Sequence, residues 1–210
     1  MVKQLRAVRT REALIRAAAE VFADDGYALA SLPAISKRAG VSTGALHFHF
    51  ASKDVLAAAV ENAAAERVAR LADRCRATGE TSLQVLVDTN SGLLQALADD
   101  PVVRAGFRLS GDPSRKNDSA FLRRWHESVR DLVADAQGAG ELERTVSADA
   151  ATTVIVASMV GLGALGAADG NWLSSGRLAL FWSFLMPCMA ASPHRVLVPT
   201  ASAGGQGEGR

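Results

Sequence analysis

Two short helices separated by a four-residue turn are predicted between residues 31 and 50, and they constrain the fold more than any other stretch. Ser31 and Ser42 each stand where a helix begins, because a serine hydroxyl accepts a hydrogen bond from the backbone N–H groups of a first turn. The segment Ala39-Gly40-Val41-Ser42 separates the two helices. The second helix is barely two turns long and cannot be stable alone, so neighbouring helices must hold it. With the preceding helix, which ends at Asp24-Asp25-Gly26, the pattern predicts a helix-turn-helix.

The second short helix presents small and polar residues on one face. With Ser42 as its cap, Thr43, Gly44 and His47 share that face. Leu46 and Phe50 point elsewhere and are expected to anchor the helix. A short, well-anchored helix with such a face fits the major groove of DNA.

The rest of the chain repeats apolar residues at helical spacing and shows no strand pattern, which predicts an all-α fold of nine helices. We expect three domains: a helix-turn-helix domain over 1–52, a helical ligand-binding and dimerisation body over 53–198, and a disordered tail over 199–210. The six helices of the body are expected at about 52–77, 83–99, 102–109, 119–137, 148–167 and 174–190.

The charge distribution supports a polyanionic partner for the first domain. The whole chain has a formal net charge of only +1, but residues 1–55 carry +3, which leaves −2 for the remainder. A basic N-terminal domain followed by a mildly acidic remainder of the chain suits DNA as the partner of that domain. Charge alone also fits an ordinary solvated surface. The two cysteines, Cys75 and Cys188, have no metal-binding spacing, and the chain is expected to work in a reducing cytoplasm without a cofactor.

Residues 150–168 form the one uncharged stretch of near membrane-spanning length. Three glycines and several hydroxyl residues interrupt it, and acidic residues flank both ends without basic or aromatic anchors. We therefore expect a buried or interface helix and no membrane association. Its glycines and the largely apolar segment 174–190 predict a homodimer interface made by the last two helices.

The span from about Thr10 to Leu56 resembles the DNA-binding region of the TetR family of bacterial repressors. The matching residues are Phe22, Gly26-Tyr27, Ile35, Ala39-Gly40-Val41-Ser42, Gly44, Leu46, His49-Phe50 and Ser52-Lys53. The resemblance implies that Ser31, Ser42, Thr43, Gly44, His47 and Lys53 contact DNA. Arg11, in the basic N-terminal stretch, is a candidate contact to a phosphate or the minor groove, and an ordinary basic chain end is its equal alternative. For Lys53 the alternative is an exposed lysine without a role.

A narrower likeness extends over roughly 190 residues. The segment GALHFHF (residues 44–50) is similar to the GALYFHF of γ-butyrolactone receptors, the autoregulator-responsive TetR proteins of actinomycetes. The segment 101–109 and Trp125 resemble those receptors too, and Trp125 stands at the position of the tryptophan that lines their ligand pocket. Without this likeness, Trp125 would be assigned to the core.

Four departures set this chain apart from those receptors. The receptors usually carry lysine where this chain has Thr43, and the wider family usually carries tyrosine where it has His47, so a related but different operator is expected. A glutamine and a threonine that bind the lactone in such receptors fall at Ala64 and Leu162. Neither side chain can make a hydrogen bond, so the chain resembles a pseudo-receptor for a more apolar metabolite.

Asn90 is the candidate polar anchor for a ligand, with Thr89 as a weaker one. Asn90 lies on the apolar side of the helix over 83–99, where a buried amide must be hydrogen-bonded to the backbone, to water or to a ligand. The full expected ligand set is Leu86, Asn90, Phe107, Trp125, Val156, Met159 and Leu162.

These features together predict a dimeric transcriptional repressor that a small apolar metabolite releases from a pseudo-palindromic operator. The metabolite would be a γ-butyrolactone-type signal, an antibiotic or a biosynthetic intermediate. A DNA-binding dimer without a ligand is the alternative. An enzyme is not expected, since the sequence shows no catalytic triad pattern, phosphate loop or metal cluster.

Overall fold

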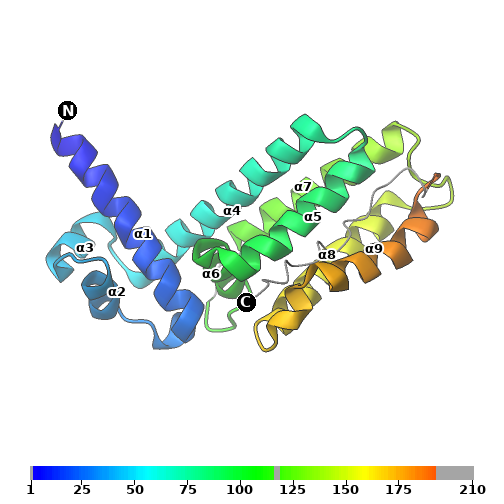
Figure 1. Cartoon of the computed structure of the whole chain (residues 1–210). Coiled ribbons are helices and arrows are strands. Elements are labelled where there is room, and N and C mark those ends of the chain that lie inside the picture. The colour runs from blue at the N-terminus through cyan, green and yellow to red at the C-terminus, as the bar shows by residue number, and fades with distance from the viewer. Residues whose placement is uncertain (1, 116–118, 193–210) are drawn as a thin grey trace, which may run out of the picture. The chain divides into compact units, whose positions relative to one another are not determined.

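The computed structural model describes residues 2–115 and 119–192, which form nine α-helices and one 3-10 helix (Figure 1). These residues contain no β-strand, although one isolated bridge pairs Leu142 with Ala190. The expected all-α fold with nine helices is therefore confirmed, whereas the expected disordered tail 199–210 lies outside the described residues. The helices are α1 Val2–Leu29, α2 Leu32–Arg38, α3 Thr43–His49, α4 Lys53–Thr78, α5 Ser82–Asp99, α6 Pro101–Ser110, α7 Ala120–Gly138, α8 Ala148–Gly166, η1 Gly170–Leu173 and α9 Ser175–Met189.

Two compact units divide the chain. The first comprises residues 1–70 and 96–125, with α1 to α3, most of α4, and α6. The second comprises residues 71–95 and 126–210, with most of α5 and α7 and all of α8, η1 and α9. The domain boundaries expected after residues 52 and 198 stay predictions.

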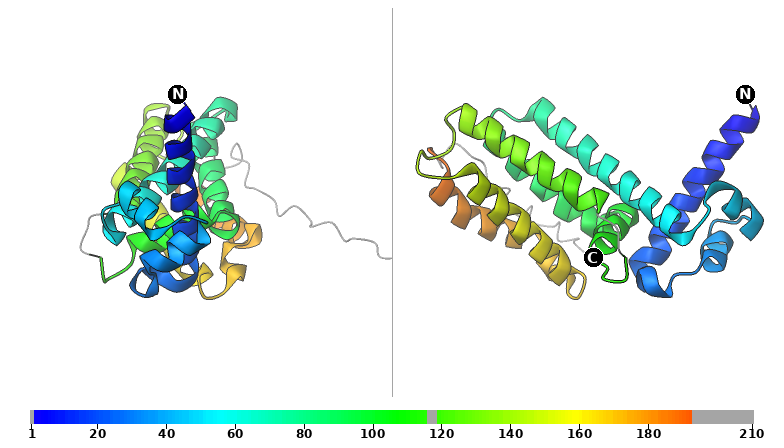
Figure 2. Two further views of the ribbon diagram at one scale, coloured as in Figure 1. Left: turned by 90° about the vertical axis from the view of Figure 1, so that its left-hand side faces the viewer. Right: turned by 180° about the vertical axis from the view of Figure 1, so that it is seen from behind.

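Local sequence signals set the first three helices, which we call the headpiece. The hydroxyl of Ser31 accepts from Ala34 N at 3.3 Å and that of Ser42 from Ala45 N at 3.1 Å, so both predicted caps are confirmed. Gly26 interrupts α1 with φ 78° and Gly40 ends α2 with φ 67°, a backbone region that glycine enters without strain. α2 contacts both α1 and α3, and Figure 2 shows the three helices together.

α6 packs against α1 and α4 within the first unit, and Gly106 permits the close approach to α4. A Cβ atom added at Gly106 would lie 2.4 Å from the Cβ of Ala64, which is fully buried on α4, and 3.6 Å from the ring of Phe121. Ala64 Cβ cannot rotate out of the way. The backbones of α4 and α6 are therefore held at a separation that only a glycine allows.

Gly106→Ala is expected to destabilise the protein by about 1–3 kcal/mol, because a methyl group in a filled core forces the two helices apart. Urea unfolding at a fixed protein concentration measures the change. Gly138→Ala is the control, since nothing lies within 4 Å of a Cβ added at the end of α7. The cost of Gly106→Ala should shrink in an Ala64→Gly background, and an undiminished cost there would refute the steric explanation.

A carboxylate from a distant loop caps α5 in the second unit. Glu141 accepts hydrogen bonds from the backbone nitrogens of Ser82 at 3.2 Å and Leu83 at 2.9 Å. The backbone of the same segment pairs with the end of α9, through Glu143 N to Met189 O and Ala191 N to Glu141 O. Free N–H groups at a helix start favour a negative charge, so Glu141 stabilises α5 from outside the helix.

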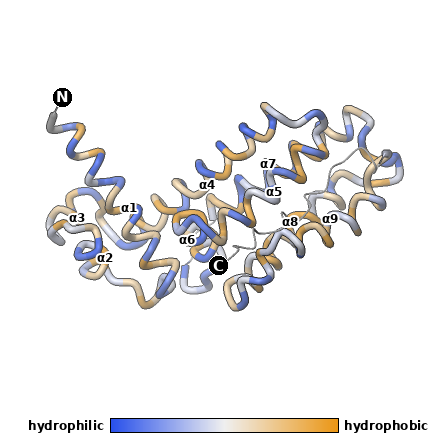
Figure 3. Tube along the Cα trace, in the orientation of Figure 1, coloured by the Kyte–Doolittle hydropathy of each residue, from blue (hydrophilic) through white to orange (hydrophobic). Residues whose placement is uncertain are grey.

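α8 is long and apolar enough to cross a membrane by length and composition alone. Figure 3 shows that apolar positions predominate along it. Its buried residues form one stripe within the second unit, made by Ala151, Thr152, Ile155, Met159 and Gly163. The opposite side exposes Val154 and Leu165. α8 therefore packs on its own unit along one face and leaves an apolar face open. The interface role expected for this helix stays a prediction.

Candidate functional site

Buried anchors hold the short helix α3 in place. Leu46 is fully buried and Phe50, at its C-cap, is buried as well. The Oγ atom of Ser36 on α2 lies 3.3 Å from Oγ1 of Thr43, at the start of α3. A seven-residue helix is unstable alone, so these contacts fix its position.

One face of α3 is open to solvent, and we call Thr43, Gly44, His47 and Phe48 the reading face. All four residues are exposed. The structure brings Thr43, Gly44 and His47 together as the sequence predicted. Phe48 was missed, although its ring is 82% exposed and meets His49 edge-on at 5.3 Å. Its position four residues after Gly44 was the signal that could have found it.

The other residues expected to contact DNA border this face in different ways. Ser31 and Ser42 are exposed and use their hydroxyls as helix caps. Arg11 extends from α1, and its guanidinium carbon lies 5.3 Å from the centre of the Phe50 ring. An arginine over an aromatic ring keeps its donors free at the edge, where they can bind a phosphate oxygen.

Lys53 is engaged inside the protein, which differs from the expected role at a helix start. Its ammonium donates to the carbonyl oxygens of Tyr27 at 2.9 Å and Ala30 at 3.0 Å, and it lies 4.4 Å from the centre of the Tyr27 ring. The neighbouring Asp54 accepts the hydroxyl of Tyr27 at 2.6 Å. Burial, followed by this hydrogen bond, raises the pKa of Tyr27 to about 12. Lys53 and Asp54 thus bind the end of α1 to the start of α4.

A buried ion pair lies close to this connection. The guanidinium of Arg115 lies 2.8 Å from the carboxylate of Glu61 on α4, and both side chains are only 4% exposed. Ser119 donates its hydroxyl to Glu61 at 3.0 Å, and Arg115 lies 5.5 Å from the centre of the Tyr27 ring. This cluster was not predictable from the sequence, because its members are far apart in the chain and follow no helical spacing.

Two of the expected ligand residues lie in the first unit. Trp125 is buried, and its indole Nε1 has no hydrogen-bond partner among the described residues. Phe107 is half-buried and meets Phe121 edge-on, with ring centres 6.4 Å apart. Trp125 therefore offers a buried donor that the protein does not use.

The other five expected ligand residues lie in the second unit. Leu86, Asn90 and Met159 are buried, whereas Val156 and Leu162 are half-buried. Asn90 donates its amide to the carbonyl of Leu86 at 2.7 Å. Its Oδ1 atom has no partner in the part of the chain that the structure describes, and neither have the hydroxyls of Thr89 and Thr152. Half of the Asn90 amide is satisfied by the backbone, and its acceptor is available to a ligand.

A family model, a relative of known function and solved structures all match this chain. The family model described as "Bacterial regulatory proteins, tetR family" matches residues 14–60. The A-factor receptor protein of Streptomyces griseus is 34% identical over 197 residues, which cover 90% of this chain and 67% of the receptor. A solved γ-butyrolactone receptor (ArpA-like protein) aligns with a TM-score of 0.73 and 32% identity, over 91% of this chain and 92% of its own. The Streptomyces coelicolor protein CprB, solved with its operator sequence, gives a TM-score of 0.74 and 31% identity, over 90% of this chain and 94% of its own.

Proposed function

The chain belongs to the TetR family of bacterial regulatory proteins, and from this premise we propose that it is a dimeric transcriptional repressor released from its operator by a small apolar metabolite. The observation that carries the proposal is the exposed reading face on an anchored helix. Two headpieces about 34–36 Å apart would enter successive major grooves of a pseudo-palindrome. The protein would act in the cytoplasm, where that DNA lies.

The reading face offers a specific chemistry to base pairs. Phe48 exposes an aromatic ring, which suits contact with the C5-methyl group of thymine, and His47 beside it suits a base edge or a phosphate. Gly44 lets the helix backbone approach the groove closely. Thr43 contributes a hydroxyl where the receptors usually carry a lysine, so the operator should be related to theirs and not identical.

The residues around the reading face would position it on the phosphate backbone. Ser31 and Ser42 begin two helices whose first N–H groups can bind phosphate, and Arg11 adds a charged donor. We assign Lys53 a positioning role, because its donors are directed to the carbonyls at the end of α1. It would set the angle of the headpiece without contacting DNA itself.

Phe48→Ala is expected to weaken operator binding about tenfold, since one good base contact is worth ~1–3 kcal/mol. The operator is first selected from a random-sequence DNA pool with the wild-type protein, and affinities are then measured by gel shift at constant salt. Leu29→Ala is the matched control, because Leu29 is an equally exposed apolar residue of the first unit, at 81%. Equal losses for the two variants would contradict the assignment of the reading face.

The ligand proposal rests on the relatives and on unused polar atoms. The relatives include a receptor for A-factor and a γ-butyrolactone receptor, which supports a small metabolite as the signal. Trp125 offers an unpaired donor and Asn90 an unpaired acceptor. Antibiotics, their intermediates and γ-butyrolactones carry groups that can use either one. Coupling of ligand binding to DNA release is typically worth ~1–3 kcal/mol.

We further propose that this chain is a pseudo-receptor that does not read a lactone as its relatives do. Ala64, where such receptors carry glutamine, is fully buried against Gly106. Leu162, where they carry threonine, is an apolar side chain. A thermal-shift screen of secreted metabolites, followed by operator gel shifts with each hit, tests this proposal. Tight binding of a γ-butyrolactone with operator release would refute it.

The dimer would form through α8 and α9. In the single chain these helices expose Val154, Leu165, Leu180 and Phe184, with Phe184 77% and Leu180 66% exposed. Large apolar side chains that gather on exposed helix faces favour an association surface, because extended apolar patches are rare on a monomer. A second copy that covers the same face would form a two-fold symmetric interface.

A further inference from the structure

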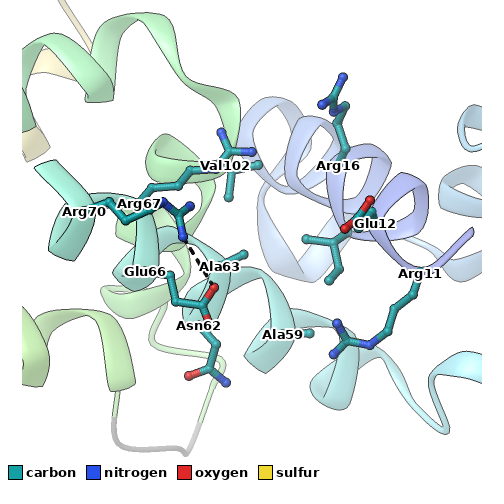
Figure 4. A pocket seen from close by; sticks show the side chains of 11 residues that line it. Arg11, Glu12, Arg16, Ala59, Asn62, Ala63, Glu66, Arg67, Arg70 and Val102 are labelled. Atoms are coloured by element: carbon teal, nitrogen blue, oxygen red, sulfur yellow. Dashed lines mark ion pairs between the residues drawn. The ribbon is translucent and has the colours of Figure 1, made fainter. Parts of the chain in front are cut away.

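A cleft of about 380 Å³ opens between α1 and α4 in the first unit (Figure 4). Four arginines line it, Arg11 and Arg16 from α1 and Arg67 and Arg70 from α4. Only Arg11 among them has a role in the proposed function. The volume falls within the range of small-molecule sites, about 300–1,000 Å³.

The two arginines on α4 are already paired. Arg67 forms an ion pair with Asp100, and Arg70 lies 4.0 Å from Glu66, as the dashed line in Figure 4 shows. On the α1 side, neither Arg16 nor Arg11 makes a hydrogen bond or ion pair with the described residues, and Arg11 lies over the Phe50 ring. Glu12 is the only carboxylate that α1 contributes to the lining. The cleft thus keeps one positive charge in excess.

A smaller part of the cleft lining is apolar. Ile15 from α1, Ala63 from α4 and Val102 from α6 contribute to its lining. Guanidinium groups bind carboxylates through two parallel hydrogen bonds, and apolar side chains take up an aliphatic body. A single excess charge suits a monoanion better than a dianionic phosphate.

We propose that this cleft is a second ligand site, which binds a small amphipathic carboxylate between α1 and α4. On binding, Arg70 exchanges Glu66 for the carboxylate, and Arg16, whose side chain points away from α4 in Figure 4, turns toward it from α1. The apolar part of the lining holds the hydrocarbon part. A consequence rests on the proposed function: the bound anion neutralises part of the charge on α1, next to Arg11, and lowers operator affinity. The site is separate from Trp125 and does not require the metabolite proposed above.

Isothermal titration of the full-length protein with octanoate tests the site directly, without DNA. Octanoate should bind, and Arg16→Ala and Arg70→Ala should each weaken binding about tenfold through loss of a charge-assisted pair. Arg74→Ala, an exposed arginine of α4 outside the cleft, and Trp125→Ala should leave octanoate binding unchanged. Arg16→Gln, which keeps a polar side chain of similar length, serves if Arg16→Ala does not fold.

Two further probes separate the contributions of charge and hydrocarbon. Octanamide, the neutral analogue, should bind at least about tenfold more weakly, and inorganic phosphate should also bind more weakly than octanoate. Equal binding of either probe would overturn the proposal, as would an absence of octanoate binding. Loss of octanoate binding in Trp125→Ala alone would assign octanoate to the other ligand site and likewise overturn it.

Gel shifts keep this proposal distinguishable from the proposed function. Wild-type protein without octanoate should bind the selected operator, and saturating octanoate should weaken that binding in the wild type but not in Arg16→Ala. If the wild-type protein does not bind the operator even without octanoate, the repressor proposal is refuted, but the titration result still stands. If Arg16→Ala weakens operator binding yet leaves octanoate binding unchanged, the cleft is a DNA backbone contact and the second site is refuted.

Discussion

Arg115→Ala is expected to lower the free energy of unfolding by about 3–5 kcal/mol. The substitution leaves the carboxylate of Glu61, whose side chain is 4% exposed, without a counter-charge inside the first unit. Among the described residues, Ser119 would remain as its only hydrogen-bond donor. A buried charge without a partner cannot recover its lost hydration. Urea unfolding at pH 7 and a fixed protein concentration measures the change, because the stability of the proposed dimer would depend on concentration.

Arg130→Ala is the matched control for this substitution. Arg130 pairs with Asp131 at 3.2 Å, but the two side chains are 56% and 60% exposed. Such surface pairs contribute about 0–1 kcal/mol. Combining Arg115→Ala with Glu61→Ala should cost less than the two single losses added together, because no buried charge is left. A loss for Arg115→Ala no greater than that for Arg130→Ala would contradict the assignment of a buried pair.

Phe184→Glu is expected to convert the dimer to a monomer and to weaken operator binding about 100-fold or more. The substitution places a charge in the apolar face that α8 and α9 expose, where Leu180 lies one turn away on the same side of α9. Burying an unpaired carboxylate against a second copy is too costly to be tolerated. A monomer then binds one half-site and loses the gain of two linked headpieces, which is of the order of 10²–10⁴.

Sedimentation velocity and gel shifts with the selected operator measure the two effects of Phe184→Glu. Leu29→Glu is the control for association, since it makes the same change at an equally exposed position of the first unit. It should remain a dimer. A Phe184→Glu protein that still sediments as a dimer would show that another surface joins the two copies.

The parts of the fold that follow from short-range rules were predictable from the sequence. Ser31 and Ser42 cap the helices they were expected to cap, because capping depends on residues only three positions apart. Gly26 interrupts α1 and Gly40 follows the end of α2, both at positive φ values that favour glycine. Thr43, Gly44 and His47 share a face because helical spacing alone decides that.

Contacts between distant residues decided the rest. Lys53 was expected at a phosphate, but its donors are directed to carbonyls that lie 23 and 26 residues earlier in the chain. Glu141 caps α5 from 58 residues away, and Glu61 depends on Arg115 and Ser119. The helical spacing of residues in the sequence does not indicate such partners, because these side chains come together only when the helices pack.

The last helix, α9, shows which features follow from the sequence and which follow only from the tertiary structure. Its composition indicated that it must be covered on nearly all sides, and that requirement can be read from residues 174–190 alone. The tertiary structure decided which side the chain itself covers: Leu178, Trp182, Met186 and Met189 are buried, whereas Leu180 and Phe184 remain exposed. The sequence thus determined that α9 needs partners. Only the packing of the second unit decided which of its residues are left for another molecule, because burial depends on neighbours that are distant in the chain.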